Sequence, residues 1–319
     1  MIVVTGASGF VGSALVRRLA AEGRAVRALA RREGALQGAA GLQRIDVGDL
    51  TTVGDWRELL GGAQALVHCA ARVHVMQDSA ADPLAAFRRM NVELTHSLAR
   101  AAAEMGVRRF VFISSIKVNG EATLPGRPFA AADMPAPVDP YGISKWEAEK
   151  SLWQVAADTG LEVVVIRPPL VYGPGVRANF LSMMRWVRAG VPLPLGAIDN
   201  RRSLVALDNL VDLVVAALDR PESAGGTFLA SDGEDLSTTD LLRRLGRAMG
   251  RPARLIPVPV DALRVIGGMF GRRDVIDRLC GSLQVDIRPT AERLGWRPPV
   301  GVDAALALAA DSLSLPHRR

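Results

Sequence analysis

The segment that decides the fold is "MIVVTGASGFVGSALVRRLAA", residues 1–21. It opens with a short apolar run rich in β-branched residues and continues with helical periodicity. Between the two stand Gly6, Gly9 and Gly12, spaced three apart. In a strand–turn–helix unit the first glycine permits a tight turn, the second lets a diphosphate approach the backbone, and the third lets helix and strand pack closely. This arrangement predicts a dinucleotide-binding turn, with the phosphates on the free N–H groups of the helix N-terminus. The residues expected there are Gly6, Ser8, Gly9, Phe10, Val11 and Gly12.

Further apolar runs follow at regular intervals, and stretches with helical character separate them. The strand-like runs are 25–30, 65–71, 109–115 and 162–168, and the clearest helical stretches are 84–105 and 140–159. Nearly continuous apolar strands that alternate with helices predict a parallel sheet covered on both faces. The expected fold class is therefore α/β, a Rossmann-type doubly wound parallel sheet.

The regular alternation ends near residue 170. Loops rich in Pro and Gly surround a predicted helix at 178–189, one more strand and helix are expected at 204–219, and helices with short connectors fill 236–319. We expect a dinucleotide-binding domain over 1–170, to which 203–230 returns. The remaining segments, 171–202 and 231–319, are expected to form a smaller C-terminal substrate-binding lobe.

Composition narrows the classes of protein that need to be considered. The 319 residues are 49% hydrophobic and 23% charged, which is typical of a globular chain. No apolar run approaches the roughly 20 residues that cross a bilayer, and no basic leader precedes the first strand, so we expect a cytoplasmic protein without membrane insertion. Cys69 and Cys280 lack metal-ligand spacing, and no metal is expected.

The net charge of +6 raises the question of an anionic partner. The arginines are dispersed along the chain without interleaved aromatic residues, so nucleic acid is not expected as a partner. An anionic small molecule is the expected one.

The end of the second strand bears on which dinucleotide binds. An acidic residue there would bind the ribose 2′-hydroxyl of NAD, but this chain has Ala30 followed by Arg31 and Arg32. A guanidinium pairs with a 2′-phosphate, so NADP(H) is preferred and NAD(H) is the alternative. Asp49 and Leu50, in "DVGDL", are further candidates on the adenine side of the cofactor; a simple turn is the other interpretation of this segment.

A tyrosine and a lysine stand four residues apart in "DPYGISKWEAEK", residues 139–150. Asp139 can cap a helix that Pro140 begins, which places Tyr141 and Lys145 on one helical face. A tyrosine has a pKa of about 10, and a nearby ammonium lowers it toward the range useful for proton transfer. The strand that ends in "FISS" carries serines to the edge of the sheet where ligands bind in this fold class.

Taken in order, these motifs resemble the extended short-chain dehydrogenase/reductase family, which contains nucleotide-sugar epimerases, dehydratases and reductases. The resemblance runs over essentially the whole chain and rests on "TGASGFVG", "HCAA", "NVELT", "SSIKVNGE", "YGISK", "RPPLVYGPG" and "RRSLVALDNLVD". It implies a catalytic triad of Ser115, Tyr141 and Lys145, with Ser115 preferred to Ser114. It also implies cofactor contacts at Ala70, Ala71, Asn91, Tyr141, Lys145 and Pro168. The implied substrate contacts are Ser115, Lys117, Asn179, Arg202 and Arg278.

The resemblance leaves the reaction open. A dehydratase would need carboxylates beside Ser115, where Ile116 and Lys117 stand, so dehydration is disfavoured. The first hypothesis is NADPH-dependent reduction of the C4 keto group of a UDP-linked 4-keto-6-deoxy-N-acetylhexosamine for surface-polysaccharide (O-antigen) synthesis. In it Tyr141 donates the proton, and Lys145 acidifies Tyr141 and positions the cofactor ribose.

Two alternatives remain. The first is an NAD-dependent 4-epimerase of a UDP-hexose such as UDP-glucose or UDP-N-acetylglucosamine. The second, remote and of another class, is a non-catalytic NADP-binding regulator. Relatives often pair through a helical bundle that would include 140–159, so the resemblance leaves a homodimer open, while the sequence itself does not define the oligomeric state.

Overall fold

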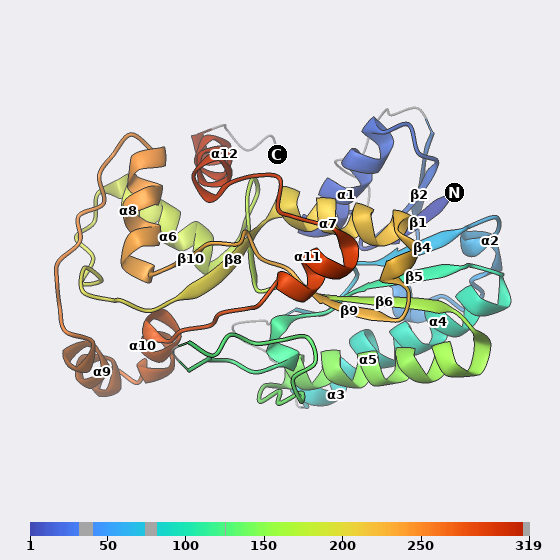
Figure 1. Ribbon diagram of the computed structural model, residues 1–319, viewed down its shortest axis with the longest axis horizontal. Coiled ribbons are helices and arrows are strands. Elements are labelled where there is room, and N and C mark those ends of the chain that lie inside the picture. Colours follow the sequence, from blue (N-terminus) through green and yellow to red (C-terminus); the bar gives the residue numbers. More distant parts are fainter. Residues whose placement is uncertain (32–40, 74–81, 125, 315–319) are drawn as a thin grey trace.

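A seven-stranded parallel sheet forms the centre of the larger part of the molecule (Figure 1). The computed structural model describes residues 1–31, 41–73, 82–124 and 126–314. The strand order is β3-β2-β1-β4-β5-β6-β9, and each neighbouring pair is parallel. The strands are β1 (Ile2–Thr5), β2 (Val26–Ala30), β3 (Leu42–Asp46), β4 (Ala65–His68), β5 (Arg109–Ile113), β6 (Glu162–Arg167) and β9 (Gly226–Leu229). The predicted doubly wound α/β fold is confirmed.

Helices cover both faces of this sheet, as Figure 1 shows. Because side chains alternate along a strand, Val4 and Val111 enter the core beneath one layer of helices, while Val3 and Phe110 enter the opposite core. On the first face lie α1 (Phe10–Ala21) and α7 (Leu207–Asp219). On the second lie α2 (Arg57–Leu60), α3 (Pro83–Arg88), α4 (Leu94–Glu104) and α5 (Pro140–Thr159).

A smaller sheet of order β10-β8-β7 organises the second part of the molecule. Phe180, Leu242 and Leu306 are fully buried in the core between this sheet and its helices. Its strands are β7 (Leu170–Tyr172), β8 (Arg202–Ala206) and β10 (Asp235–Leu236). The helices that follow in the chain are α6 (Ala178–Ala189), α8 (Thr238–Ala248), α9 (Val260–Met269), α10 (Arg273–Cys280), α11 (Arg288–Leu294) and α12 (Val302–Ser314).

Asp232 joins the two parts of the molecule. Its carboxylate accepts hydrogen bonds from the Tyr172 hydroxyl at 2.8 Å, from the Ala206 N–H at 2.7 Å and from Asn209 Nδ2 at 2.7 Å. These donors belong to β7, to the end of β8 and to α7. Burial raises the pKa of Asp232, and the three hydrogen bonds oppose this shift by stabilising the charged carboxylate inside the protein.

The helical stretch predicted over 84–105 is interrupted. Between α3 and α4 lies a π-helical turn, η2 (Arg89–Glu93), which contains the buried Asn91. A π turn adds one residue to a helical turn and re-aims the side chains next to it, and such turns occur often at functional sites. The predicted helical character of this stretch is confirmed, and the π turn within it is a feature that the sequence did not predict.

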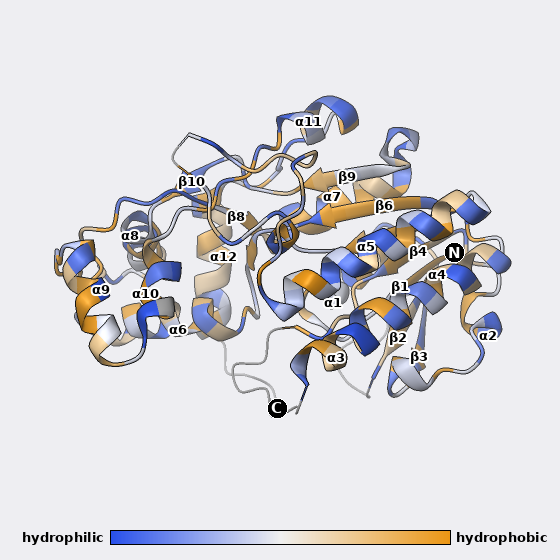
Figure 2. Ribbon diagram, turned by 90° about the horizontal axis from the view of Figure 1, so that it is seen from below, coloured by the Kyte–Doolittle hydropathy of each residue, from blue (hydrophilic) through white to orange (hydrophobic). Residues whose placement is uncertain are grey.

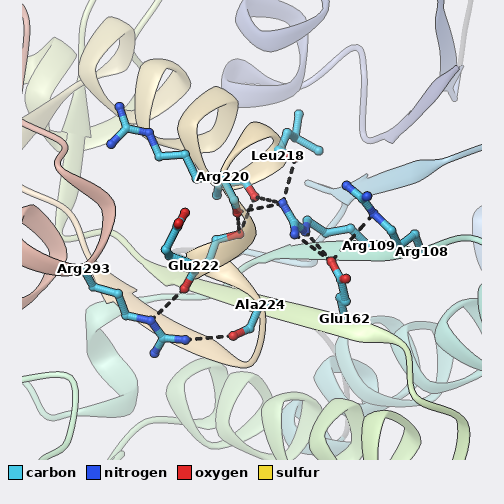
Figure 3. A network of polar contacts seen from close by, with 10 residues as sticks. Arg108, Arg109, Glu162, Leu218, Arg220, Glu222, Ala224 and Arg293 are labelled. Atoms are coloured by element: carbon cyan, nitrogen blue, oxygen red, sulfur yellow. Dashed lines mark hydrogen bonds and ion pairs between the residues drawn. The ribbon is translucent and has the colours of Figure 1, made fainter.

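Arg109, the first residue of β5, connects the N-terminal ends of the central strands to the end of α7 (Figure 3). This end of the sheet is opposite to the one that carries the glycine turn. The Arg109 side chain is 2% exposed, pairs with Glu162 at 2.6 Å, and donates from Nη1 to the carbonyl oxygens of Ala217, Leu218 and Arg220. These carbonyls stand at the C-terminal end of α7, where the helix itself offers no donors.

Elsewhere, three short helical turns, η1 (Leu50–Thr52), η3 (Ile116–Val118) and η4 (Pro221–Ser223), complete the connections. Among the described residues, no helix has both the length and the apolar character that crossing a bilayer requires.

His68 is a fully buried histidine at the end of β4. Its Nδ1 lies 2.6 Å from Thr5 Oγ1 and its Nε2 lies 3.1 Å from Thr95 Oγ1, and its ring stacks on Phe112. Burial, with a smaller contribution from the charge of Lys145, lowers the pKa of His68 to about 3. The ring is therefore neutral in the folded protein at any ordinary pH.

This burial predicts a measurable pH dependence of stability. In the unfolded chain His68 takes up a proton as the pH falls below about 6.5, whereas the folded protein does not until about pH 3. The free energy of unfolding should thus decrease with falling pH in this interval, by at most about 1.4 kcal/mol per pH unit from this group. Urea denaturation of His68→Gln should show a flatter dependence, and the exposed His96→Gln control should keep the wild-type slope. Equal slopes in wild type and His68→Gln would contradict the assignment.

Candidate active site

The glycine turn is packed so closely that it admits no side chains. Gly6 has a φ of +66°, and a Cβ there would lie 2.7 Å from the backbone nitrogen of Ala70. A Cβ on Gly12 would collide with the carbonyl oxygen of Gly6. Gly9 precedes α1 and offers no capping side chain, so the N–H groups of the first helical turn stay available to an anion. This cradle fits the diphosphate of a dinucleotide.

The residues predicted on the adenosine side occupy different environments. Arg31 is exposed directly after β2, and Arg32 lies outside the described residues. Asp49 caps η1, because its carboxylate accepts hydrogen bonds from the N–H and the hydroxyl of Thr51, both at 2.9 Å. These hydrogen bonds lower the pKa of Asp49, and the charges of Arg89 and Arg31 lower it further. Leu50, next in the chain, is buried.

Asn91 connects the loop after β4 to the helix that carries the tyrosine and the lysine. Its Oδ1 accepts a hydrogen bond from the Arg72 N–H at 2.8 Å, and its Nδ2 donates to the Arg72 carbonyl at 3.1 Å and to Ser144 Oγ at 2.9 Å. Ala70 and Ala71 precede Arg72 in that loop, and Ser144 precedes Lys145 in α5. Asn91 therefore orders both sides of the candidate cofactor site.

The start of α5 follows the predicted pattern. Asp139 accepts a hydrogen bond from the Gly142 N–H at 2.6 Å, and Pro140 is the first helical residue. Lys117, predicted as a substrate contact, forms an ion pair with Asp139 and lies 3.1 Å from Glu121. In this arrangement Lys117 supports the helix cap that positions Tyr141.

The two serines at the end of β5 have different partners. The Ser114 hydroxyl donates to Glu149, which is fully buried and pairs with Arg167 at 2.6 Å. The Ser115 hydroxyl accepts a hydrogen bond from the Lys117 N–H at 3.3 Å, and its interaction with the Tyr141 phenol lowers the pKa of that phenol. Ser115 is thus the serine that acts on the tyrosine, and Ser114 belongs to the support beneath it.

Burial shifts the pKa values of Tyr141 and Lys145 away from their ordinary values. Burial raises the pKa of Tyr141 to about 12, against a smaller lowering effect of the hydrogen bond with Ser115. Burial also lowers the pKa of Lys145 to about 8, partly offset by the negative charge of Glu149. Lys145 Nζ donates to the Ile113 carbonyl at 2.8 Å and lies 4.3 Å from the centre of the Phe112 ring.

The expectation that Lys145 acidifies Tyr141 is therefore wrong for the chain alone. The ammonium is directed at a backbone carbonyl and an aromatic ring, and burial governs the phenol. Phe87 of α3 adds to that burial, since its ring packs against Tyr141 at a centroid distance of 6.1 Å. A further positive charge beside the phenol is needed before it can serve as a base near neutral pH.

Two of the predicted substrate contacts meet in the smaller part of the molecule. Arg202 Nη1 donates to the Arg278 carbonyl at 2.8 Å and to the Gly281 carbonyl at 3.0 Å, so it anchors the end of α10. Burial lowers the pKa of Arg202. The Arg278 side chain is exposed.

Asn179 is exposed in the first turn of α6, next to Ala178, whose φ is +54°. A non-glycine residue in this region is strained by about 1 kcal/mol or more, and such strain is commonest at ligand sites. Pro168, the last predicted cofactor contact, is buried after β6, and its carbonyl accepts a hydrogen bond from the Ile116 N–H at 3.0 Å. Within the described ranges, no cluster of His, Cys, Asp and Glu could hold a metal ion.

The fold and this site define an oxidoreductase or epimerase of the short-chain dehydrogenase/reductase type. Residues 2–230 match the NAD dependent epimerase/dehydratase family, and the chain belongs to that family. A UDP-glucose 4-epimerase of Vibrio cholerae is 49% identical over 304 residues, which cover 93% of this chain and 90% of that protein. The predicted family membership and the prediction of an enzyme are confirmed.

Solved structures show the same architecture. UDP-glucuronic acid 4-epimerase from Bacillus cereus, in complex with NAD, superposes with a TM-score of 0.80 at 21% identity and 98% coverage of both chains. MoeE5, in complex with UDP-glucose and NAD, superposes with a TM-score of 0.78 at 26% identity, again over 98% of each chain.

Several residues of the site carried no signal in the sequence. Glu149 and Arg167 form a buried ion pair, and Arg167 Nη1 also donates to Asn119 Oδ1 at 2.9 Å. Glu149 stands one helical turn after Lys145 in α5. A second charged residue on the face of this helix that carries Lys145 was the one hint of the ion pair in the sequence. Ser144 and the Phe87 ring could be identified only from tertiary packing.

The different partners of the two serines predict separable effects. Ser114→Ala should lower the free energy of unfolding by about 1–3 kcal/mol, because it removes one of the two hydrogen bonds to the buried Glu149 Oε1, the other of which comes from Arg167 Nε. Ser115→Ala should instead lower kcat by roughly 10²-fold with little change in stability. Urea denaturation and turnover assays of both variants measure the contrast. The assignment fails if Ser114→Ala is the variant that loses turnover while keeping wild-type stability.

Proposed function

We propose that this chain is an NAD-dependent 4-epimerase of a UDP-hexose, with UDP-glucose as the first substrate to test. The observation that carries the proposal is the 49% identity to UDP-glucose 4-epimerase over 93% of the chain, a span that includes most of the smaller part of the molecule. In this proposal segments 171–202 and 231–319 hold the UDP-sugar, through Asn179, Arg202 and Arg278. This choice replaces the reductase as the leading hypothesis.

The choice of NAD over NADP has support from the charges near the adenosine site. NADP was preferred because Arg31 and Arg32 stand where an acid was expected. Arg31 lies within electrostatic range of Asp49, whose pKa it helps to lower, so part of its charge is already matched by a carboxylate. A 2′-phosphate would be repelled by Asp49, whereas a free 2′-hydroxyl would not. The B. cereus epimerase and MoeE5 were both solved with NAD.

The chemistry needs a proton acceptor that can also return the proton. When bound, NAD would supply a hydride acceptor for C4 of the sugar and, once reduced, a hydride donor to the opposite face. Tyr141 takes the proton of the C4 hydroxyl during oxidation and gives it back during reduction, and Ser115 donates a hydrogen bond to the same sugar oxygen. Since the pKa of Tyr141 is about 12 in the chain alone, the positive charge of the oxidised cofactor would be needed to stabilise the phenolate. Surface-polysaccharide synthesis and a homodimer stay predictions.

Cofactor content distinguishes the epimerase from the reductase. Mass spectrometry of the denatured purified protein should detect NAD, and the protein should interconvert UDP-glucose and UDP-galactose without added cofactor. Retention of NAD is expected because an epimerase regenerates it in every turnover. Detection of NADP, together with NADPH oxidation by a UDP-linked 4-keto-6-deoxy-N-acetylhexosamine, would establish the reductase instead.

The role of the phenol can be tested with the two tyrosines of the chain. Tyr141→Phe should retain NAD and lose at least about 10²-fold in kcat, because no other group takes the proton. Tyr172→Phe removes a buried hydrogen bond to Asp232 and should lower stability by about 1–3 kcal/mol while kcat stays close to wild type. Undiminished turnover by Tyr141→Phe would refute the mechanism.

A further inference from the structure

The positive charge of the chain is concentrated in one segment. Residues 241–280 contain nine arginines and three aspartates and no lysine or glutamate, a net charge of +6. The whole chain also has a net charge of +6, so the other 279 residues are balanced. The dispersed distribution expected from the sequence holds for the individual arginines and is wrong for the net charge.

The same segment exposes an unusual number of large apolar side chains. On α9 and directly after it, Val265 is 65% exposed, Ile266 50%, Met269 79% and Phe270 75%. Only Leu263 and Gly267 of this helix are buried, so α9 packs against the rest of the protein along one narrow side. Figure 1 places α9 at the end of the molecule far from the large sheet, and Figure 2 shows its apolar colour beside the hydrophilic α10.

Two of these apolar side chains, Ile266 and Phe270, line a depression together with Arg272. A hollow of about 530 Å³ lies among residues that include Ile266, Phe270 and Arg272. Ile256, on the preceding connection, is 50% exposed, and Arg254 and Arg273 are exposed nearby in the sequence. We name this surface the α9 face; it consists of Arg254, Ile256, Val265, Ile266, Met269, Phe270, Arg272 and Arg273.

We propose that the α9 face docks the enzyme onto a membrane surface that contains anionic phospholipids. A short amphipathic helix can lie in the plane of the bilayer interface, with its apolar side chains among the acyl chains. Flanking arginines then contact lipid phosphates, and their long side chains reach the headgroups from a buried helix. Such docking requires no helix that spans the bilayer.

The charge of the segment favours a bilayer over a second copy of the chain. In a symmetric dimer the same patch of each subunit meets its own copy. Two α9 faces in contact would bring Arg254, Arg272 and Arg273 of one copy against those of the other, and like charges across an interface are unfavourable. An anionic bilayer supplies both the apolar phase and the compensating charge.

The docking surface is separate from the candidate catalytic residues. It is nevertheless connected to the substrate side, because α10 follows the α9 face in the chain and its Arg278 carbonyl accepts a hydrogen bond from Arg202. A docked enzyme would thus keep its smaller part next to the membrane. Because the α9 face does not include the candidate catalytic residues, membrane binding and epimerisation can be measured independently.

The test uses the full-length protein and sedimentation with vesicles. Wild type should sediment with vesicles of phosphatidylcholine that contain about one-third phosphatidylglycerol, and should stay in the supernatant with phosphatidylcholine alone. High salt should weaken the binding, because it screens the contribution of the arginines. The double variant Met269→Ser/Phe270→Ser should bind at least about tenfold more weakly, as should Arg272→Gln/Arg273→Gln.

The control is Met134→Ser, a matched substitution at a side chain that is 88% exposed outside the α9 face, and it should bind like wild type. Thermal denaturation verifies that each variant is folded, and turnover of UDP-glucose in solution should be unchanged in the α9 variants. Failure of wild type to sediment with the anionic vesicles would overturn the proposal. So would equal vesicle binding by wild type and Met269→Ser/Phe270→Ser together with dissociation of a dimer in that variant, which would assign the α9 face to contact between copies.

Discussion

The site depends on a helix that holds a phenol and an ammonium against the edge of the sheet, and one buried ion pair keeps that helix in place. Glu149 of α5 is fully buried and meets Arg167 at the end of β6, with 2.6 Å between Nη2 and Oε2. Ser114 donates to the same carboxylate and Asn119 accepts from the same guanidinium, so β5, β6, α5 and the loop after β5 converge on one cluster. Removing either charge would leave the other buried without an opposite charge, which is far more costly than losing an exposed pair. The cluster therefore fixes α5, and α5 fixes Tyr141 and Lys145.

The same burial that orders the site also raises the pKa of its phenol, so that added positive charge is needed to stabilise a phenolate. With a pKa of about 12, Tyr141 is a neutral phenol near pH 7. Lys145, with a pKa of about 8, donates to the Ile113 carbonyl and contacts the Phe112 ring instead of the phenol. An oxidised nicotinamide is cationic and a reduced one is not. The ionisation of the tyrosine would thus follow the redox state of the cofactor, which suits a reaction that takes a proton in one half and returns it in the other.

The sequence predicted what depends on local pattern. Glycine spacing, apolar runs and the Asp139 cap gave the turn, the sheet and the start of α5, because each is set by neighbouring residues. It did not predict the π turn at Asn91, the division of labour between Ser114 and Ser115, or the direction of the Lys145 side chain, since those depend on which distant groups meet. Residue type alone also does not fix the cofactor, since Arg31, on which the NADP prediction rests together with Arg32, interacts electrostatically with Asp49.

The most direct measurement is an ultraviolet difference titration of the tyrosines with and without bound NAD. The chain contains two tyrosines, and subtracting the spectrum of Tyr141→Phe isolates the signal of Tyr141 from that of Tyr172. Without NAD, the account predicts that Tyr141 remains a phenol through the ordinary tyrosine range and ionises only near pH 12, and that saturation with NAD lowers its pKa. Ionisation of Tyr141 at or below its ordinary pKa without NAD, or an identical pKa in both titrations, would contradict the account.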